Sequence, residues 1–149
     1  MTIVTLAASL LISCNGNRSD ARKSNDQPDA TDSLAMGSSD MLYLAVGTYT
    51  SKEGSRGIYL YRFDTLTGKS DSVSMAEVTN PSWLTFSPDE KTLYAVGEND
   101  AEQSAVHAFS FDKAKGRLQK INSQETKGSG PCYVTIDAKG RNVHTANYG

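Results

Sequence analysis

From residue 41 onward, apolar residues occur in short runs, several of which alternate with polar residues, and turn-forming residues separate the runs. Runs of this length with alternating side chains are typical of half-buried β-strands. No window has the apolar 3.6-residue period of an amphipathic helix. The pattern therefore predicts an all-β chain with these strand-like runs: 42–47, 57–63, 72–78, 82–87, 92–98, 105–112 and 118–124.

The runs belong to an internal repeat of about fifty residues. NPSWLTFSPDEKTLYAVGEN at 80–99 returns as GPCYVTIDAKGRNVHTANYG at 130–149, and LAVG at 44–47 returns as YAVG at 94–97. One period holds four short strands joined by turns such as Pro88-Asp89, which is typical of a β-propeller blade. We therefore expect a β-propeller of four-stranded antiparallel blades.

Two or three complete or partial blades fit into the sequence. The runs at 42–47, 57–63 and 72–78 correspond to the second, third and fourth strands of an opening blade. Its first strand has no counterpart, because residues 15–40 contain too few apolar residues to supply one. Three blades do not close a ring, so we expect residues 41–149 to be the N-terminal part of a longer propeller.

The N-terminal fourteen residues, MTIVTLAASLLISC, are the most apolar stretch of the chain. They are too short to span a bilayer but suit a secretory signal, and Leu11 to Cys14 resemble a bacterial lipobox, whose cysteine is acylated. No Lys or Arg precedes the apolar run, so a chance match or a different start remains the alternative. Residues 15–40 are rich in Ser, Asp and Asn, and we expect them to be a disordered tether.

Composition narrows the function classes. The net charge of −2 argues against a nucleic-acid partner, which needs a clustered basic surface. Acylation of Cys14 would leave Cys132 unpaired, so no disulfide is predicted, and Cys132 corresponds to Ser82 in the repeat. No spacing of His, Asp and Glu suggests a metal site, and no cofactor is expected.

Strand parity brings separate parts of the sequence together. In an antiparallel meander the links alternate between two ends, so the link after a blade's second strand lies at the same end as the link into the next blade. The other end carries Lys-rich turns. The first end is therefore the expected functional face, with these candidate residues: Tyr49, Arg56, Asn80, Glu98, Tyr133, Asn147 and Tyr148.

Five motifs in order resemble one family, the seven-bladed propeller lactonases typified by bacterial 6-phosphogluconolactonases of the propeller type. They are YLAVGTYT, GIYLYRFD, NPSWLTFSPDEKTLYAVGE, GPCYVTID and TANYG, and together they run from about residue 42 to residue 149. The resemblance implies a seven-bladed ring, hydrolysis of a sugar-acid lactone without an obligatory metal, and a monomer at full length.

Lactone hydrolysis requires a general base for the attacking water and a group that holds the developing oxyanion. Glu98, the one carboxylate at the end of a channel-proximal strand on the functional face, is the candidate base or substrate ligand; its alternative role is to order the neighbouring loop. Relatives often carry His at the position of Tyr133, and a phenol is a poor base. Tyr133 could still donate a hydrogen bond or stack on a sugar ring, or it and Trp83 could simply be aromatic packing between blades.

The remaining candidates are substrate ligands. Arg56, together with the nearby Lys52, could hold a phosphate or a sugar carboxylate, and Arg56 could equally be a solvated loop cation. Tyr49, Asn147 and Tyr148 are candidate binding groups for a sugar lactone, as is Asn80, which could instead cap the turn before Pro81.

Three functions remain open at this point. The first is an envelope lactonase, anchored only by an N-terminal lipid, that prefers an unphosphorylated aldonolactone because phosphogluconolactone is cytosolic; without a true signal, the protein would be cytoplasmic. The second is a noncatalytic envelope propeller that binds a glycan or a protein. The third is a cyclase or isomerase of muconate-type substrates, since propellers host many activities.

Overall fold

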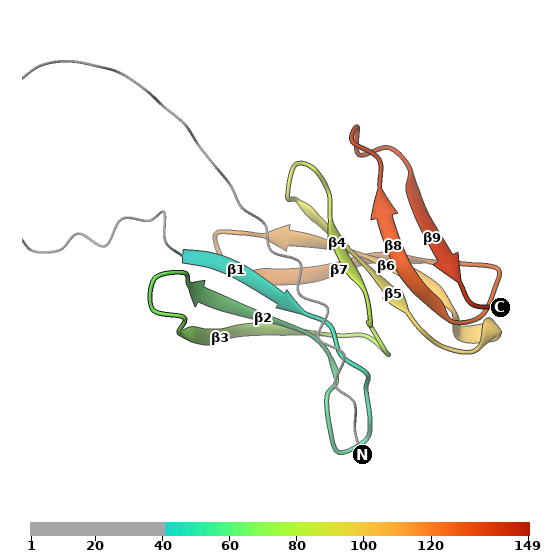
Figure 1. Ribbon diagram of the computed structural model, residues 1–149, viewed down its shortest axis with the longest axis horizontal. Coiled ribbons are helices and arrows are strands. Elements are labelled where there is room, and N and C mark those ends of the chain that lie inside the picture. Colours follow the sequence, from blue (N-terminus) through green and yellow to red (C-terminus); the bar gives the residue numbers. More distant parts are fainter. Residues whose placement is uncertain (1–40) are drawn as a thin grey trace, which may run out of the picture.

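The computed structural model describes residues 41–149, which form three antiparallel sheets side by side (Figure 1). The first sheet contains β1 (Met41–Val46), β2 (Gly57–Asp64) and β3 (Ser70–Glu77). The second contains β4 (Leu84–Phe86), β5 (Thr92–Gly97), β6 (Ala105–Asp112) and β7 (Arg117–Glu125), with the short 3₁₀ turn η1 (Ala101–Gln103) before β6. The third contains β8 (Pro131–Ile136) and β9 (Val143–Asn147).

Within each sheet, every strand pairs with its neighbour in sequence, so the chain follows the expected meander. The predicted all-β propeller architecture is confirmed: the second sheet is a four-stranded blade, and the first has three strands among residues 41–149. The predicted strands agree with the observed ones to within about two residues at each end. The predicted signal peptide (1–14) and tether (15–40) lie outside the described residues.

The strand β5 carries apolar residues on both of its faces. Its side chains alternate between two cores, because the second sheet is covered on both faces. Leu93 and Ala95 pack toward the first sheet, whereas Val96 belongs to the core shared with Val134 of the third sheet. Tyr94 packs against that second core.

The larger core lies between the first and second sheets. Phe109, Ile58, Leu60 and Leu93 are fully buried there. The partly buried Phe86 and Phe111 close one side, with ring centroids 5.5 Å apart. The two sheets therefore have a fixed relative position, which matters because the candidate residues come from both of them.

The fifty-residue repeat extends to backbone conformation. Asn80 and its repeat equivalent Gly130 both have positive φ, 47° and 58°, as the chain enters a new blade. Glu98 N donates to Asn80 O at 3.0 Å, and the equivalent Tyr148 N donates to Gly130 O at 3.1 Å. The turn also explains why β4 is shorter than predicted: Ser82 N bonds back to Asn80 O at 2.8 Å instead of joining the β-ladder.

In residues 41–149, no helix is long and apolar enough to cross a membrane.

Gly47, which follows β1, lies close to the backbone of Pro81, in the segment that leads into the second sheet. A Cβ atom there would lie 2.0 Å from the carbonyl oxygen of Pro81. We expect Gly47→Ala to lower the free energy of unfolding of the full-length protein by about 1–3 kcal/mol, because the backbone must shift to admit the methyl group. Thermal or denaturant unfolding measures the change.

Gly54→Ala is the matched control. Its added Cβ would meet the Ser51 hydroxyl at 2.5 Å, and that side chain can rotate away at little cost. Equal stability of the two variants would show that the Gly47 contact does not constrain the sheets.

Candidate functional site

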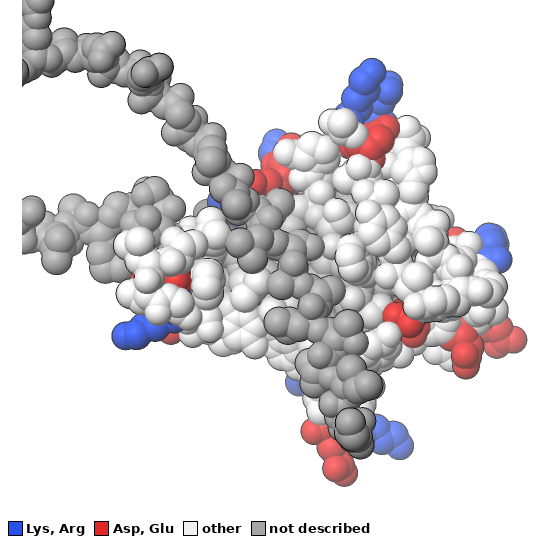
Figure 2. Space-filling view, in the orientation of Figure 1, with Lys and Arg blue, Asp and Glu red and all other residues white. Residues whose placement is uncertain are grey.

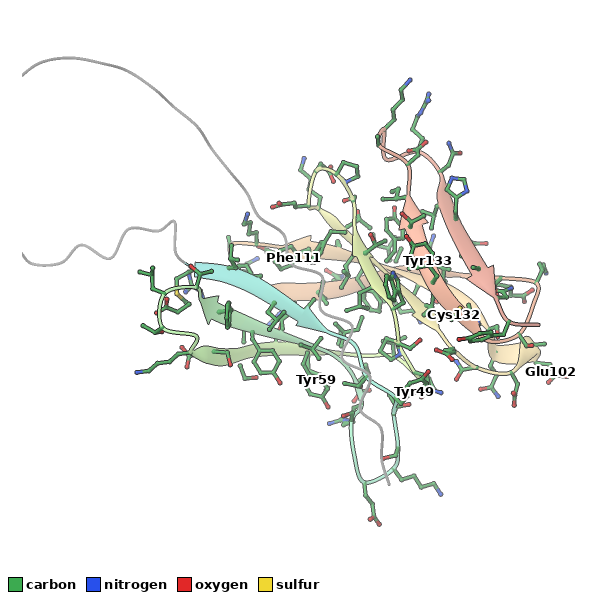
Figure 3. The ribbon with its side chains drawn as sticks, viewed as in Figure 1. Tyr49, Tyr59, Glu102, Phe111, Cys132 and Tyr133 are labelled. Atoms are coloured by element: carbon green, nitrogen blue, oxygen red, sulfur yellow. The ribbon has the colours of Figure 1, made fainter. Side chains whose placement is uncertain are left out.

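The structure brings three of the predicted site residues together at the seam between the first and second sheets. Tyr49 lies in the loop after β1, Asn80 in the segment between β3 and β4, and Glu98 directly after β5. Figure 3 shows Tyr49 at the end of the molecule where β1 leaves the first sheet. The loop, the inter-blade segment and the strand end meet as strand parity predicts.

The Glu98 carboxylate is held by two hydroxyl groups. The Tyr49 phenol donates to Glu98 Oε2 at 2.8 Å, and the Ser82 hydroxyl donates to the same oxygen. The other oxygen, Oε1, accepts no hydrogen bond from residues 41–149. A carboxylate fixed through one oxygen and open at the other has the geometry of a general base, because its open oxygen remains available to a proton.

Tyr49 is suited to remain a donor in this arrangement. Partial burial, and then the hydrogen bond to Glu98, raise the pKa of Tyr49 above its ordinary value of 10.0, and Tyr148 adds the smallest contribution in the same direction. The folded state therefore favours the protonated phenol. The hydrogen bond to Glu98 is present at neutral pH and is lost only as pH rises through that raised pKa.

Asn80 is the hub of the seam. Its Oδ1 accepts hydrogen bonds from Thr50 N at 2.9 Å and Thr50 Oγ1 at 3.0 Å, and its Nδ2 donates to Asn99 Oδ1 at 2.9 Å and to Glu98 O at 3.3 Å. One amide thus joins the β1–β2 loop to the segment that carries Glu98. This position makes Asn80 a positioning residue for the carboxylate.

An aromatic pair lies on the inner strands of the second and third sheets. The rings of Trp83, just before β4, and Tyr133, on β8, have centroids 4.9 Å apart at an angle of 47°. The structure therefore shows the inter-blade contact that the repeat suggested. Yet Trp83 and Tyr133 are still 36% and 42% exposed, so the pair also offers an aromatic surface. The visible surface over β8 and β9 carries few charges (Figure 2).

The candidates of the third sheet do not bond to Glu98. Asn147 Nδ2 donates to Thr126 O at 3.4 Å, after β7, while its Oδ1 is buried without a partner in residues 41–149. Tyr148 is 82% exposed and forms its hydrogen bond through the backbone. Their proposed role as substrate ligands thus depends on a substrate large enough to reach them.

Arg56 lies apart from the carboxylate. Its guanidinium forms an exposed ion pair with Glu77 at the end of β3, the outer strand of the first sheet. Arg56 lines a separate cleft that Glu98 does not line. The sequence could not separate Arg56 from Glu98. The order of the strands shows at which end of a blade a loop lies, but it does not show how far the loop's side chains lie from the central channel of the propeller.

Sequence analysis named Ser82 only as the repeat equivalent of Cys132, and it did not choose Thr50, whose partner is the Asn80 amide, as a candidate. A signal was available for Ser82, since it adjoins Pro81 at the end predicted to be functional. The choice of Glu98 as its partner depends on strand register and rotamer, which sequence pattern does not specify.

Among the described residues, no group of three or more His, Cys, Asp or Glu side chains converges to hold a metal ion. Cys132 is a free thiol, and its Sγ lies 3.6 Å from Ala146 O.

Comparison with known proteins identifies the family of this chain. Residues 43–149 match the family described as "Lactonase, 7-bladed beta-propeller". The chain belongs to this family. The match covers almost all of the described residues, and it agrees with the meander of four-stranded blades.

Named relatives share sequence and fold with the chain. It is 38% identical over 104 residues to the 6-phosphogluconolactonase of Bacillus subtilis, covering 69% of this chain and 29% of that protein. A proposed 6-phosphogluconolactonase from Bacteroides fragilis has 48% identity and a TM-score of 0.69, covering 82% and 32%. The periplasmic gluconolactonase of Pseudomonas aeruginosa has 38% identity and a TM-score of 0.67, covering 72% and 31%.

The chain therefore spans about a third of the length of these relatives.

The hub role of Asn80 can be tested with two substitutions. Asn80→Gly removes the side-chain hydrogen bonds but tolerates the positive φ, as Gly130 does in the repeat. Asn80→Ala removes the same bonds and also places a Cβ in the left-handed region. We expect both to destabilise the full-length protein, with Asn80→Ala less stable than Asn80→Gly by about 1 kcal/mol.

Unfolding midpoints of the two variants give the comparison. An Asn80→Ala protein as stable as the wild type would refute the hub role, since neither the hydrogen bonds nor the backbone strain would then matter.

Proposed function

We propose that the full-length protein hydrolyses a sugar-acid lactone and that Glu98 is the general base. The observation that carries this proposal is the Glu98 carboxylate, which Tyr49 and Ser82 hold through Oε2 while Oε1 accepts no hydrogen bond from residues 41–149. The family and the names of the relatives support the reaction class.

In the proposed reaction, water attacks the carbonyl carbon of the lactone while Glu98 Oε1 accepts a proton from that water. The C–O bond of the ring then breaks, and the ring oxygen takes a proton and becomes the hydroxyl group of the open-chain acid. Water is the co-reactant, and no oxidation or reduction occurs.

Trp83 and Tyr133 are proposed to contact the sugar ring. Aromatic faces bind the C–H faces of sugars, and both rings are accessible. In this arrangement Tyr133 is a binding group rather than a base. The exposed Tyr148 and the amide of Asn147 are proposed to bind hydroxyl groups at the far end of the substrate.

We also propose that the preferred substrate is an unphosphorylated aldonolactone in the cell envelope. The lipobox-like sequence ending in Cys14 supports that location, and one similar protein is named a periplasmic gluconolactonase. The Bacillus subtilis and Formosa agariphila relatives are named 6-phosphogluconolactonases, so both substrates belong in the assay.

Glu98→Gln is the direct test of the base. In the full-length protein it should lower kcat on gluconolactone by about 10²–10⁴-fold, because the amide has the same shape but cannot accept the proton. Initial rates on gluconolactone and its 6-phosphate, corrected for spontaneous hydrolysis, give the value. Glu90→Gln, in a turn where Glu90 pairs with Lys113, should leave kcat unchanged.

A wild-type rate no greater than background on both lactones would reject the enzyme proposal. In that case the exposed Trp83–Tyr133 pair favours a noncatalytic propeller that binds a glycan. Wild-type activity that survives Glu98→Gln would instead reject only the role of Glu98.

Attachment to the membrane through Cys14 is a separate proposal. Labelled palmitate should be incorporated into the wild-type protein in bacteria and should be lost in Cys14→Ser, because acylation requires the thiol. Cys132→Ser is the matched control and should retain the label. Incorporation that persists in Cys14→Ser would rule out the anchor.

A further inference from the structure

A second concave site lies beside the outer strands of the first two sheets. Its cavity volume is about 660 Å³, within the range of small-molecule sites. The β1–β2 loop and the end of β3 form one wall, and Asn99 and Gln103 together with His107 of β6 and Lys120 of β7 form the other. The cleft therefore spans two blades, and their packing fixes its shape.

The charged groups of the cleft are mostly cationic. Lys52 and Arg56 from the first sheet's loop face Lys120 of β7, and Glu77 is the one carboxylate among the lining residues. These four groups carry a net charge of +2, whereas the whole chain carries −2. The positive charge of this cleft is thus a local feature of an acidic chain, which is what an anion site requires.

His107 lines the cleft without adding to this charge. Its Nδ1 lies 2.8 Å from Ser123 Oγ, and the ring is half-buried. Burial, and then the nearby Lys120, lower the pKa of His107 to about 4. At neutral pH the imidazole is therefore neutral and serves as a polar wall of the cleft.

The rest of the lining is hydrophilic. Val78 is the one aliphatic residue among those that line the cleft. The others in this part of the lining carry hydroxyl or amide side chains: Thr50, Ser51, Ser55, Thr79, Asn99 and Gln103. Such a lining gives little binding energy to an apolar ligand. It suits a ligand that has hydroxyl groups along its length and a negative charge at one end.

The cleft is separate from the carboxylate site. Tyr49, Ser82 and Glu98 are not among its lining residues, whereas Thr50 and Asn99 are. Both of these residues also bond to the Asn80 amide. The Asn80 hub therefore lies between the two sites and stabilises one wall of each.

We propose that this cleft binds a hydrophilic oxyanion, a phosphate or carboxylate group on a hydroxylated carbon chain, at a site distinct from Glu98. Arg56 exchanges its exposed ion pair with Glu77 for a bidentate contact with the anion, and Lys52 and Lys120 approach from opposite walls. The proposal reassigns Arg56 from the lactone site to this cleft and does not depend on lactonase activity.

Titration calorimetry on the full-length protein at low ionic strength tests the site with three probes: inorganic phosphate, gluconate and 6-phosphogluconate. We expect at least one to bind at millimolar concentration or below and to bind more weakly as salt is added. Tighter binding of the two phosphates identifies a phosphate site, and tighter binding of gluconate than of inorganic phosphate identifies a carboxylate site.

Variants locate the bound anion. Arg56→Ala and Lys120→Ala should each weaken binding about ten-fold, since each removes a charged partner. Glu77→Gln should tighten it several-fold, because it releases Arg56 and removes the one negative charge. Lys115→Ala is the matched control, since Lys115 pairs with Asp112 in the β6–β7 turn and does not line the cleft.

Two results would overturn the proposal. One is the absence of binding by all three probes. The other is binding that Glu98→Gln or Tyr49→Phe changes while Arg56→Ala and Lys120→Ala leave it intact, which would place the anion at the carboxylate site. Lactone hydrolysis is measured in a separate assay, so failure of the anion site and failure of the lactonase proposal are distinguishable.

Discussion

The apolar core between the first and second sheets determines how the loops of the candidate site are placed relative to each other. Ile58 and Leu60 of β2 pack against Leu93 and Phe109 of the second sheet, and all four are fully buried. Since a packed interface of this kind tolerates little sliding, the loop after β1 and the end of β5 have one relative position. The hydrogen bond between Tyr49 and Glu98, forty-nine residues apart in sequence, depends on that position.

The same seam produces two chemically different sites. On one side, two hydroxyl groups hold a carboxylate through a single oxygen, an arrangement suited to proton transfer. On the other, cations from both sheets surround a hydrophilic cleft. The Asn80 amide separates and supports the two, so a residue that binds neither ligand can affect both.

Much of the fold followed from the sequence because the blade repeats. Alternation located the strands, and the fifty-residue offset related Asn80 to Gly130, which both have positive φ in the structure. Strand parity correctly grouped Tyr49, Asn80 and Glu98 at one end. It could not show that Arg56 turns outward to Glu77, because a side chain's radial position depends on loop conformation and on the nearest opposite charge.

The sequence by itself determined the architecture, the repeat and the end of the blades where polar residues gather, because these depend on local periodicity and on the order of the strands. Only the tertiary structure decided that Ser82 and Tyr49 share one oxygen of Glu98 and that Lys120 lines a cleft together with the β1–β2 loop. Those contacts join separate blades, so they depend on how one sheet packs against the next. No local pattern in the chain encodes the distance between two sheets.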